Sequence, residues 1–363
     1  MYKSCNVAQM PLCFKGTNGD YSDSVNKKKT TSLNLKIKTE NLNDDLLRKV
    51  KQGLTKGLPI VHHDGYVCDH PVKHRFAMRK FQTVFRHLRS DSVISVKQVV
   101  HPDMVGEDTL AGVHKPEYIQ DFFNGTTSAA AQRKTGFKWS EGLVKRCRFE
   151  TGGTITGARL ALEVGMASST AGGTHHAFPD YGSGFCLIND MAVATDFVLR
   201  QGLAEKVLIV DLDVHQGDGT AYIFRENDCV FTFSMHGVNN FPVRKQQSDL
   251  DVELPDKTGD KSYMERLQEL LPHLVKSFRP DLVVYDAGVD PHEKDELGRL
   301  CLTDQGLFDR DYYVLKYLSS QGCPCVTVIG GGYAQDVDLL GLRHTIIHRA
   351  ATKVWQEMKG CSI

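Results

Sequence analysis

The distribution of apolar and polar residues predicts an alternation of strands and helices from residue 207 to the end of the chain. Short apolar runs predict buried strands at 207–210, 229–234, 281–285 and 325–329. Stretches with helical periodicity predict helices at 221–225, 261–278, 303–321 and 335–355. This order favours a mainly parallel central sheet with helices on both faces, so we expect a single three-layer α/β domain.

In the first half of the chain, strands and helices alternate less regularly than after residue 207. Residues 1–55 are rich in Ser, Thr, Asn and Lys and predict a poorly ordered N-terminal extension, with one short helix near 44–52. The folded domain is expected to span 56–363. Within its first part the pattern predicts strands at 58–61 and 93–100, helices at 78–88, 114–122, 155–167 and up to 200, and an irregular segment at 124–150.

Residues suited to metal binding follow the strand at 207–210 directly. Asp211, Asp213 and His215 alternate along an extended segment, so their side chains can point the same way. Two carboxylates and an imidazole crowded together need a cation to offset repulsion and desolvation. A carboxylate and an imidazole are also two of the three protein ligands of a catalytic zinc site. An acidic loop that is neutralised by a lysine or by a helix N-terminus would explain the same three residues. Taken alone, these residues therefore leave both a metal site and an acidic loop open.

Three other segments carry residues of complementary chemistry. Asp290 follows the strand at 281–285 and is a candidate third metal ligand. His175 and His176 follow two glycines, and Tyr333 follows three. Each has a simpler explanation, because tandem histidines are often a surface feature and a tyrosine is often packed at a helix start. Their joint presence beyond apolar runs favours one site at the carboxyl ends of the strands.

Composition narrows the class of protein. The formal net charge of +0 gives no sign of a nucleic-acid-binding surface, and no apolar run approaches the ~18 residues of a membrane span. Ten cysteines without a Cys-x-x-Cys pair predict reduced thiols in an intracellular protein. The first residues lack the apolar region of a secretory signal, so we expect no secretion.

Five motifs follow one another in a specific order and spacing. They are GGTHHA at 172–177, GFCLIND at 184–190, DLDVHQGDGT at 211–220, AGVDPHEKDELG at 287–298 and GGGY at 330–333. With these motifs, the segment 58–355 resembles the zinc-dependent histone deacetylases, which have the arginase-deacetylase fold. HRFAMRKF at 74–81 and the motif at 287–298 are most similar to the single-domain bacterial-type members and the class IV branch.

The resemblance implies a role for each matching position. Asp213, His215 and Asp290 would bind Zn²⁺, which acts as a Lewis acid on an amide carbonyl. His176 would be the general base and then the general acid, with His175 as its electrostatic partner. The supporting positions would be Asp211 behind His175, Asp218 behind His176, and Tyr333 as hydrogen-bond donor to the developing oxyanion.

The resemblance also implies a narrow tunnel for the stem of an acyl-lysine. Phe185 and Phe241 would form its walls, and Gly184 and Leu297 would line it. Leu297 is apolar, which favours an acyl-lysine over a polyamine. Arg75 is expected either to line an inner product channel or to be a surface or ion-paired arginine. A structural monovalent cation, K⁺, would be bound by the side chains of Asp211 and Ser234 and by the carbonyl groups of Asp213, His215 and Met235.

The function implied is zinc-dependent hydrolysis of the N-ε-acyl-lysine amide in histones or other proteins. Deacylation of acetylated polyamines or other small amines, and removal of longer acyl chains, remain alternatives. A non-enzymatic scaffold is disfavoured because every expected catalytic position is occupied, and a two-manganese ureohydrolase needs more Asp and His ligands than these loops offer. Expected partners are an acylated lysine and a corepressor or chromatin complex in transcription regulation, without nucleic-acid or membrane contact. The expected location is the nucleus or cytoplasm, and the N-terminal extension leaves an organelle open.

Overall fold

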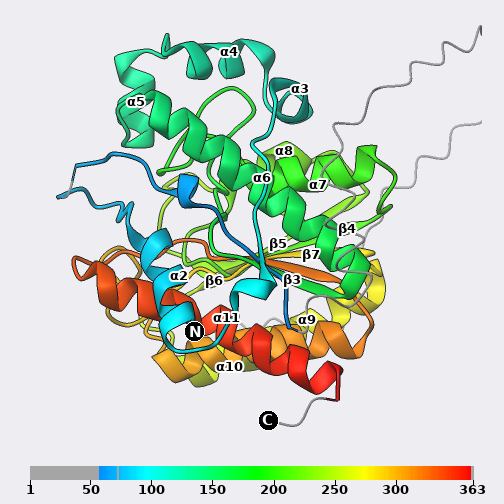
Figure 1. The fold of residues 1–363 in the computed structure, drawn as a ribbon. Coiled ribbons are helices and arrows are strands. Elements are labelled where there is room, and N and C mark those ends of the chain that lie inside the picture. Colours follow the sequence, from blue (N-terminus) through cyan, green and yellow to red (C-terminus); the bar gives the residue numbers. More distant parts are fainter. Residues whose placement is uncertain (1–56, 72, 361–363) are drawn as a thin grey trace, which may run out of the picture. The chain divides into compact units, whose positions relative to one another are not determined.

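The computed structural model describes residues 57–71 and 73–360 (Figure 1). The predicted extension at 1–55 and its short helix at 44–52 lie outside the described residues. Eight strands form one parallel sheet in the order β2-β1-β3-β8-β7-β4-β5-β6. The strands are β1 (Ile60–Val61), β2 (Val99–Val100), β3 (Met166–Ser169), β4 (Val207–Asp211), β5 (Val230–Gly237), β6 (Leu250–Leu254), β7 (Leu282–Asp286) and β8 (Cys325–Val328).

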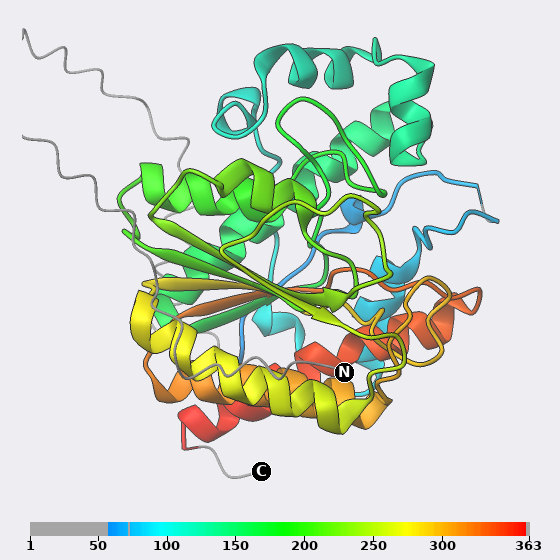
Figure 2. The same cartoon turned by 180° about the vertical axis from the view of Figure 1, so that it is seen from behind.

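Helices cover both faces of this sheet, which confirms the predicted three-layer α/β class (Figures 1 and 2). One face carries α6, α7 and α8, and the other carries α2, α9, α10 and α11. No helix among the described residues is long and apolar enough to cross a membrane. The helices are α2 (Lys80–Ser90), α3 (Glu107–Leu110), α4 (Pro116–Asn124), α5 (Ala129–Thr135), α6 (Glu141–Val164), α7 (Asp190–Arg200), α8 (Asp218–Phe224), α9 (Asp260–Phe278), α10 (Asp304–Ser320) and α11 (Val337–Met358), with short 3₁₀ helices η2 (Asp64–Tyr66) and η3 (Val96–Gln98).

The central strands β4 and β7 are apolar almost throughout because helices bury both of their faces. They pair in parallel register, so that Asp211 at the end of β4 lies beside Asp286 at the end of β7. On its other side Asp211 lies beside Ser234 of β5. The carboxyl ends of neighbouring strands therefore bring acidic residues from distant parts of the chain to one edge of the sheet.

The prediction of an irregular segment at 124–150 is wrong. Residues 129–135 form α5, and α6 begins at Glu141, well before the predicted helix start at 155. Glycines in α6 lower its intrinsic helix propensity, but they allow close packing. A Cβ at Gly157 would lie 2.7 Å from a methyl group of Val326, and a Cβ at Gly153 would collide with the hydroxyl of Tyr66. Tertiary contact therefore decides the conformation of this segment.

The helix predicted at 155–167 and the strand predicted at 93–100 also need correction, and the strands β3 and β6 were not predicted. The helix predicted to 167 ends at Val164, because Gly165 takes a left-handed conformation, and β3 follows it. The strand predicted at 93–100 is reduced to β2, because Ser95 and Gln98 form a capping box that starts η3. β6, at the edge of the sheet, was not predicted, although the alternation of apolar and polar residues in LDVEL is typical of a half-buried strand.

Candidate active site

The structure brings Asp213, His215 and Asp290 together at the carboxyl ends of β4 and β7. One potential ligand atom from each residue lies within 4.8 Å of the other two. His215 Nδ1 lies 3.0 Å from Asp213 Oδ1 and 3.1 Å from Asp290 Oδ2. All three side chains are buried. Two carboxylates and one imidazole on converging loops are a donor set that fits a catalytic zinc ion.

The pKa shifts of Asp213 and Asp290 indicate that a cation is needed between these carboxylates. Burial, together with the neighbouring carboxylate of Asp213, raises the pKa of Asp290 to about 7. Burial alone would also raise the pKa of Asp213, but the imidazoles of His175 and His215 hold it well below its usual range. A bound divalent cation would favour the ionised form of both carboxylates and offset their desolvation.

Backbone amides orient the two carboxylates. The N–H of Gly331 donates a hydrogen bond to Asp213 Oδ2 at 2.7 Å, and the N–H of Val214 donates one to Asp290 Oδ1 at 2.8 Å. Gly331 also lies too close to both carboxylates for a larger residue. A Cβ there would collide with Asp290 and would lie 2.6 Å from Asp213 Oδ2.

Replacing Gly331 by Ala is therefore expected to weaken metal binding by about 10- to 100-fold, the range seen when groups that orient a ligand are lost. The added methyl group must displace the ligand carboxylates. Titration of the metal-free variant with zinc, alongside a chelating dye, measures the change. Gly259→Ala is the matched control, since a Cβ at Gly259 meets nothing closer than 3.7 Å. An unchanged zinc affinity in Gly331→Ala would contradict the placement of the metal site.

Two histidine–aspartate pairs lie beside the candidate metal ligands. His175 Nδ1 donates to Asp211 Oδ2 at 2.7 Å, and His176 Nδ1 donates to Asp218 Oδ1 at 2.6 Å. The ring centroids of the two histidines are 4.1 Å apart. Both pairs are buried, and the aspartates fix which ring nitrogen carries a proton.

The two histidines have opposite pKa shifts. Burial and the adjacent charge of His175 lower the pKa of His176 to about 4, so His176 is neutral and its Nε2 can accept a proton. Burial alone would lower the pKa of His175, but Asp211 and Asp213 raise it well above the ordinary value. The protonated form of His175 is therefore favoured and the neutral form of His176 is favoured, as a base beside a stabilising cation requires.

Asp286 is a member of this cluster that the sequence analysis did not select. It is fully buried, and its Oδ2 lies 3.9 Å from His175 Nδ1. Neither carboxylate oxygen has a hydrogen-bond partner among the described residues. Burial and the nearby carboxylate of Asp211 raise the pKa of Asp286 well above its usual range. Its position at the end of the apolar strand β7 was the available signal.

Tyr333 lies at the junction of two cavities. The outer cavity has a volume of about 300 Å³ and opens to solvent, and the inner one has a volume of about 30 Å³. Both are lined by His176, Gly184, Phe185 and Tyr333. Burial raises the pKa of the Tyr333 phenol well above its ordinary value, which keeps the hydroxyl group a hydrogen-bond donor.

The four predicted tunnel residues all line the outer cavity. Phe185 packs with its ring centroid 5.8 Å from that of Tyr333. Phe241 stands perpendicular to His176 at 4.8 Å between ring centroids and is 41% exposed, so it lies at the entrance. Gly184 and Leu297 complete this lining. The structure thus brings together two aromatic walls and an aliphatic residue around one opening.

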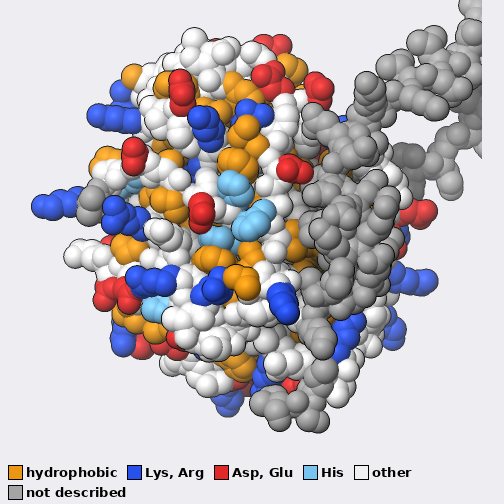
Figure 3. All heavy atoms as spheres, viewed as in Figure 1, with side chains coloured by type: hydrophobic (Ala, Val, Ile, Leu, Met, Phe, Trp, Pro, Cys, Tyr) orange, Lys and Arg blue, Asp and Glu red, His pale blue; other side chains and the backbone are white. Residues whose placement is uncertain are grey.

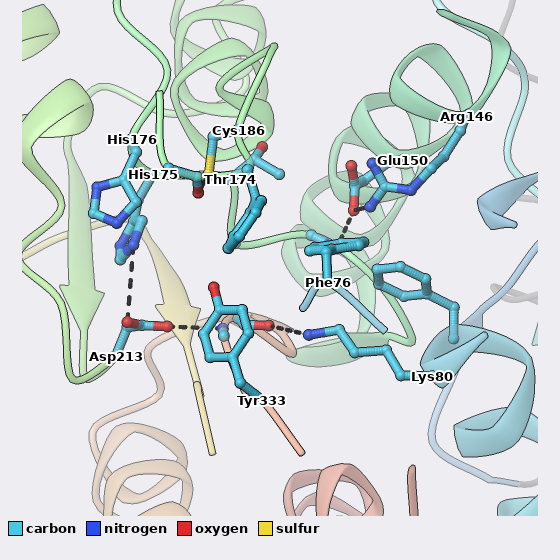
Figure 4. A pocket seen from close by; sticks show the side chains of 17 residues that line it. Phe76, Lys80, Arg146, Glu150, Thr174, His175, His176, Cys186, Asp213 and Tyr333 are labelled. Carbon is cyan, nitrogen blue, oxygen red and sulfur yellow. Dashed lines mark hydrogen bonds and ion pairs between the residues drawn. The ribbon is translucent and has the colours of Figure 1, made fainter. Parts of the chain in front are cut away.

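The inner cavity ends in buried charged groups (Figure 4). Figure 4 shows Tyr333 between the two histidines on one side and Lys80 and Arg146 on the other. Arg146 Nη2 donates to Glu150 Oε1 at 2.8 Å, and Lys80 Nζ donates to the carbonyl of Gly330 at 3.0 Å. Burial lowers the pKa of Lys80 to about 8. Arg75, considered for this channel, instead lies exposed at the outer cavity.

Arg310 is a second residue that sequence reasoning missed. It lies on α10 and is fully buried beside Asp311. Its Nη1 donates to the carbonyl of Leu212 at 3.1 Å and to that of Gly288 at 2.9 Å. Arg310 thereby joins the loop after β4 to the loop after β7, which carry the candidate metal ligands. No local pattern in α10 signals this contact.

The residues predicted to hold a monovalent cation also lie together. Ser234 is paired in the sheet with Asp211, and Met235 follows it on β5. All are buried. The Ser234 hydroxyl lies 2.9 Å from His236 Nδ1. The potassium site remains a prediction.

Comparison with known proteins shows the family of this chain. Residues 74–346 match the histone deacetylase domain family. An uncharacterised protein of Picosynechococcus is 50% identical over 299 residues, which cover 82% of this chain and 100% of that protein. Histone deacetylase 2 of Arabidopsis thaliana is 29% identical over 72% of this chain and 70% of its own. The acetoin utilization protein AcuC of Staphylococcus aureus is 30% identical over 72% of this chain and 73% of its own.

The crystal structure of the HDA15 HD domain has the same fold, with a TM-score of 0.65 and 21% identity over 84% of this chain and 94% of that domain. The parallel sheet and the family match define an α/β enzyme of the deacetylase class. The chain belongs to the histone deacetylase domain family.

Proposed function

We propose that this protein is a zinc-dependent deacetylase that hydrolyses the N-ε-acetyl-lysine amide of proteins. The observation that carries the proposal is the convergence of Asp213, His215 and Asp290 with the neutral His176 and the phenol of Tyr333 at the inner end of a solvent-open cavity. These groups match the needs of amide hydrolysis, in which a weak electrophile must be polarised and a poor leaving group protonated.

Each side chain contributes one step. When bound, a zinc ion would supply Lewis-acid polarisation of the amide carbonyl. His176 Nε2 takes a proton from the attacking water as its oxygen bonds to the carbonyl carbon, and returns the proton to the amine nitrogen as the C–N bond breaks. The Tyr333 hydroxyl donates to the oxygen that becomes negative. The positive charge of His175 stabilises the same developing charge.

The outer cavity suits a lysine stem. Phe185, Phe241 and Leu297 offer apolar contact to four methylene groups, and their packing excludes water from the amide. A polyamine places a second ammonium group along this apolar lining, which carries a desolvation cost. Acetylated small amines therefore remain the second candidate, with a lower expected rate.

A panel of acylated lysine peptides tests the proposal. An inner cavity of about 30 Å³ holds little more than a methyl group, and it ends at the Arg146–Glu150 ion pair. Overpacking costs about 1–3 kcal/mol, so we expect kcat/KM to be at least about fivefold higher for acetyl than for octanoyl. A faster octanoyl reaction would assign the protein to longer-chain deacylases. Turnover of acetylated polyamines alone would favour the second candidate.

We also propose potassium as a structural cation near the site. The carboxylate of Asp211 and the hydroxyl of Ser234 are adjacent in the sheet. Oxygen donors of this kind suit a hard monovalent cation. Its support is this adjacency and the burial of the other predicted ligand residues, Asp213, His215 and Met235, beside it.

A further inference from the structure

The entrance of the outer cavity has an unbalanced charge. Two arginines line it, Arg75 from the loop before α2 and Arg299 from the loop after β7. No Asp or Glu is among the residues that line this cavity in the described part of the chain. By contrast, basic and acidic side chains are interspersed on the face drawn in Figure 3.

The two arginines differ in what already surrounds them. Arg299 Nη1 lies 3.4 Å from Asp256 Oδ2, and these side chains are 58% and 36% exposed. Its charge is therefore partly balanced. Arg75 is exposed and forms no ion pair or hydrogen bond with any described residue. Within the described part of the chain, the guanidinium group of Arg75 therefore has no partner, and it can meet the peptide that carries the substrate lysine.

A peptide whose lysine enters the cavity must cross this entrance with its neighbouring residues. A carboxylate beside the lysine can form two parallel hydrogen bonds with the planar guanidinium group of Arg75. A lysine or arginine at the same position meets a like charge without a balancing acid. The side-chain amides of Asn239 and Asn240, which also line the outer cavity, are neutral and contribute no opposite preference.

We propose that Arg75 selects acetyl-lysines whose neighbouring residues are acidic, so that the substrates are acidic or neutral protein segments and basic tails are disfavoured. This inference rests on the proposed deacetylase function and narrows its substrate class. Arg75 is a specificity-determining residue in this account, and it takes no part in the chemistry at the metal.

Three acetyl-lysine peptides of equal length test the inference, with Asp/Glu, Gln/Ala or Lys/Arg flanking the acetyl-lysine. For the wild-type protein at about 50 mM salt, we expect kcat/KM to be about tenfold higher for the acidic than for the basic peptide, with the neutral one between them, an amount equal to about 1.4 kcal/mol. At about 0.5 M salt the ratio is expected to shrink, because charges at an exposed entrance are screened.

Variants assign the effect to its residue. Arg75→Gln is expected to abolish the preference, and Arg75→Glu to reverse it, while turnover of the neutral peptide stays within about twofold. Arg266→Glu is the matched control, since Arg266 lies on α9 and lines neither cavity. It makes the same charge change and is expected to keep the wild-type preference.

The possible outcomes distinguish a failure of the proposed deacetylase function from a failure of the role proposed for Arg75. If the neutral peptide is not hydrolysed, the proposed function fails, and the affinities of fluorescently labelled peptides then give the acidic-to-basic ratio directly. If the neutral peptide is hydrolysed but the basic peptide is preferred, or the Arg75 variants leave the ratio unchanged, the inference about Arg75 is overturned and the proposed function stands.

Discussion

Asp290→Asn is expected to lose bound zinc and to lower kcat/KM by more than about 100-fold. Removing a group that only orients a metal ligand costs up to roughly 100-fold, and Asp290 is itself a proposed ligand. Asp290 is fully buried, and its carboxylate lies 3.1 Å from His215 Nδ1, where three ligand atoms converge. An amide oxygen supplies no negative charge, so the remaining carboxylate and imidazole bind the cation weakly. Metal content and hydrolysis of an acetyl-lysine peptide are measured on the same sample.

Glu293→Gln is the control for this variant. Glu293 is exposed and three residues further along the same loop, and its replacement removes the same charge. We expect wild-type zinc content and turnover from it. Full zinc content in Asp290→Asn would show that the third ligand is assigned to the wrong residue.

Tyr333→Phe is expected to lower kcat by about 10²- to 10³-fold, the usual cost of removing one donor to an oxyanion. The variant keeps the ring that packs against Phe185 and loses only the hydroxyl group. Because the hydrogen bond strengthens as charge develops, KM and zinc content are expected to change little. Steady-state kinetics with an acetyl-lysine peptide measure both constants.

Tyr313→Phe serves as the comparison, because Tyr313 lies on α10 and lines neither the outer nor the inner cavity. It is expected to retain wild-type kinetics. A Tyr333→Phe protein with an unchanged kcat would remove the phenol from the mechanism, even if zinc remains bound.

Much of the fold could be predicted because local pattern and tertiary environment agree. Strands β4, β7 and β8 are short apolar runs, and both faces of each strand are buried. Their composition alone therefore predicts buried strands. The prediction for residues 141–154 was wrong because the glycines that permit close packing in α6 are also typical of a loop. Local propensity carries no information about the partner that such a glycine touches.

In the candidate site, too, the residues set by local spacing could be predicted, and those set by contacts with distant residues could not. The spacing of Asp211, Asp213 and His215 along an extended segment predicts a common direction, and the structure places Asp213 and His215 in one cluster with Asp290. Sequence reasoning missed Arg310, because its importance lies in hydrogen bonds to carbonyl groups 22 and 98 residues away. Arg75 was ambiguous for a similar reason, since the direction of a loop side chain depends on what surrounds it.

The most direct test of the central claim is the metal dependence of hydrolysis by the purified protein. The account predicts one zinc ion per chain, loss of acetyl-lysine peptide hydrolysis on removal of that ion by a chelator, and recovery on return of one equivalent of zinc. Undiminished hydrolysis after complete removal of zinc would contradict the account, as would a zinc-loaded protein that hydrolyses neither acyl-lysines nor acetylated amines.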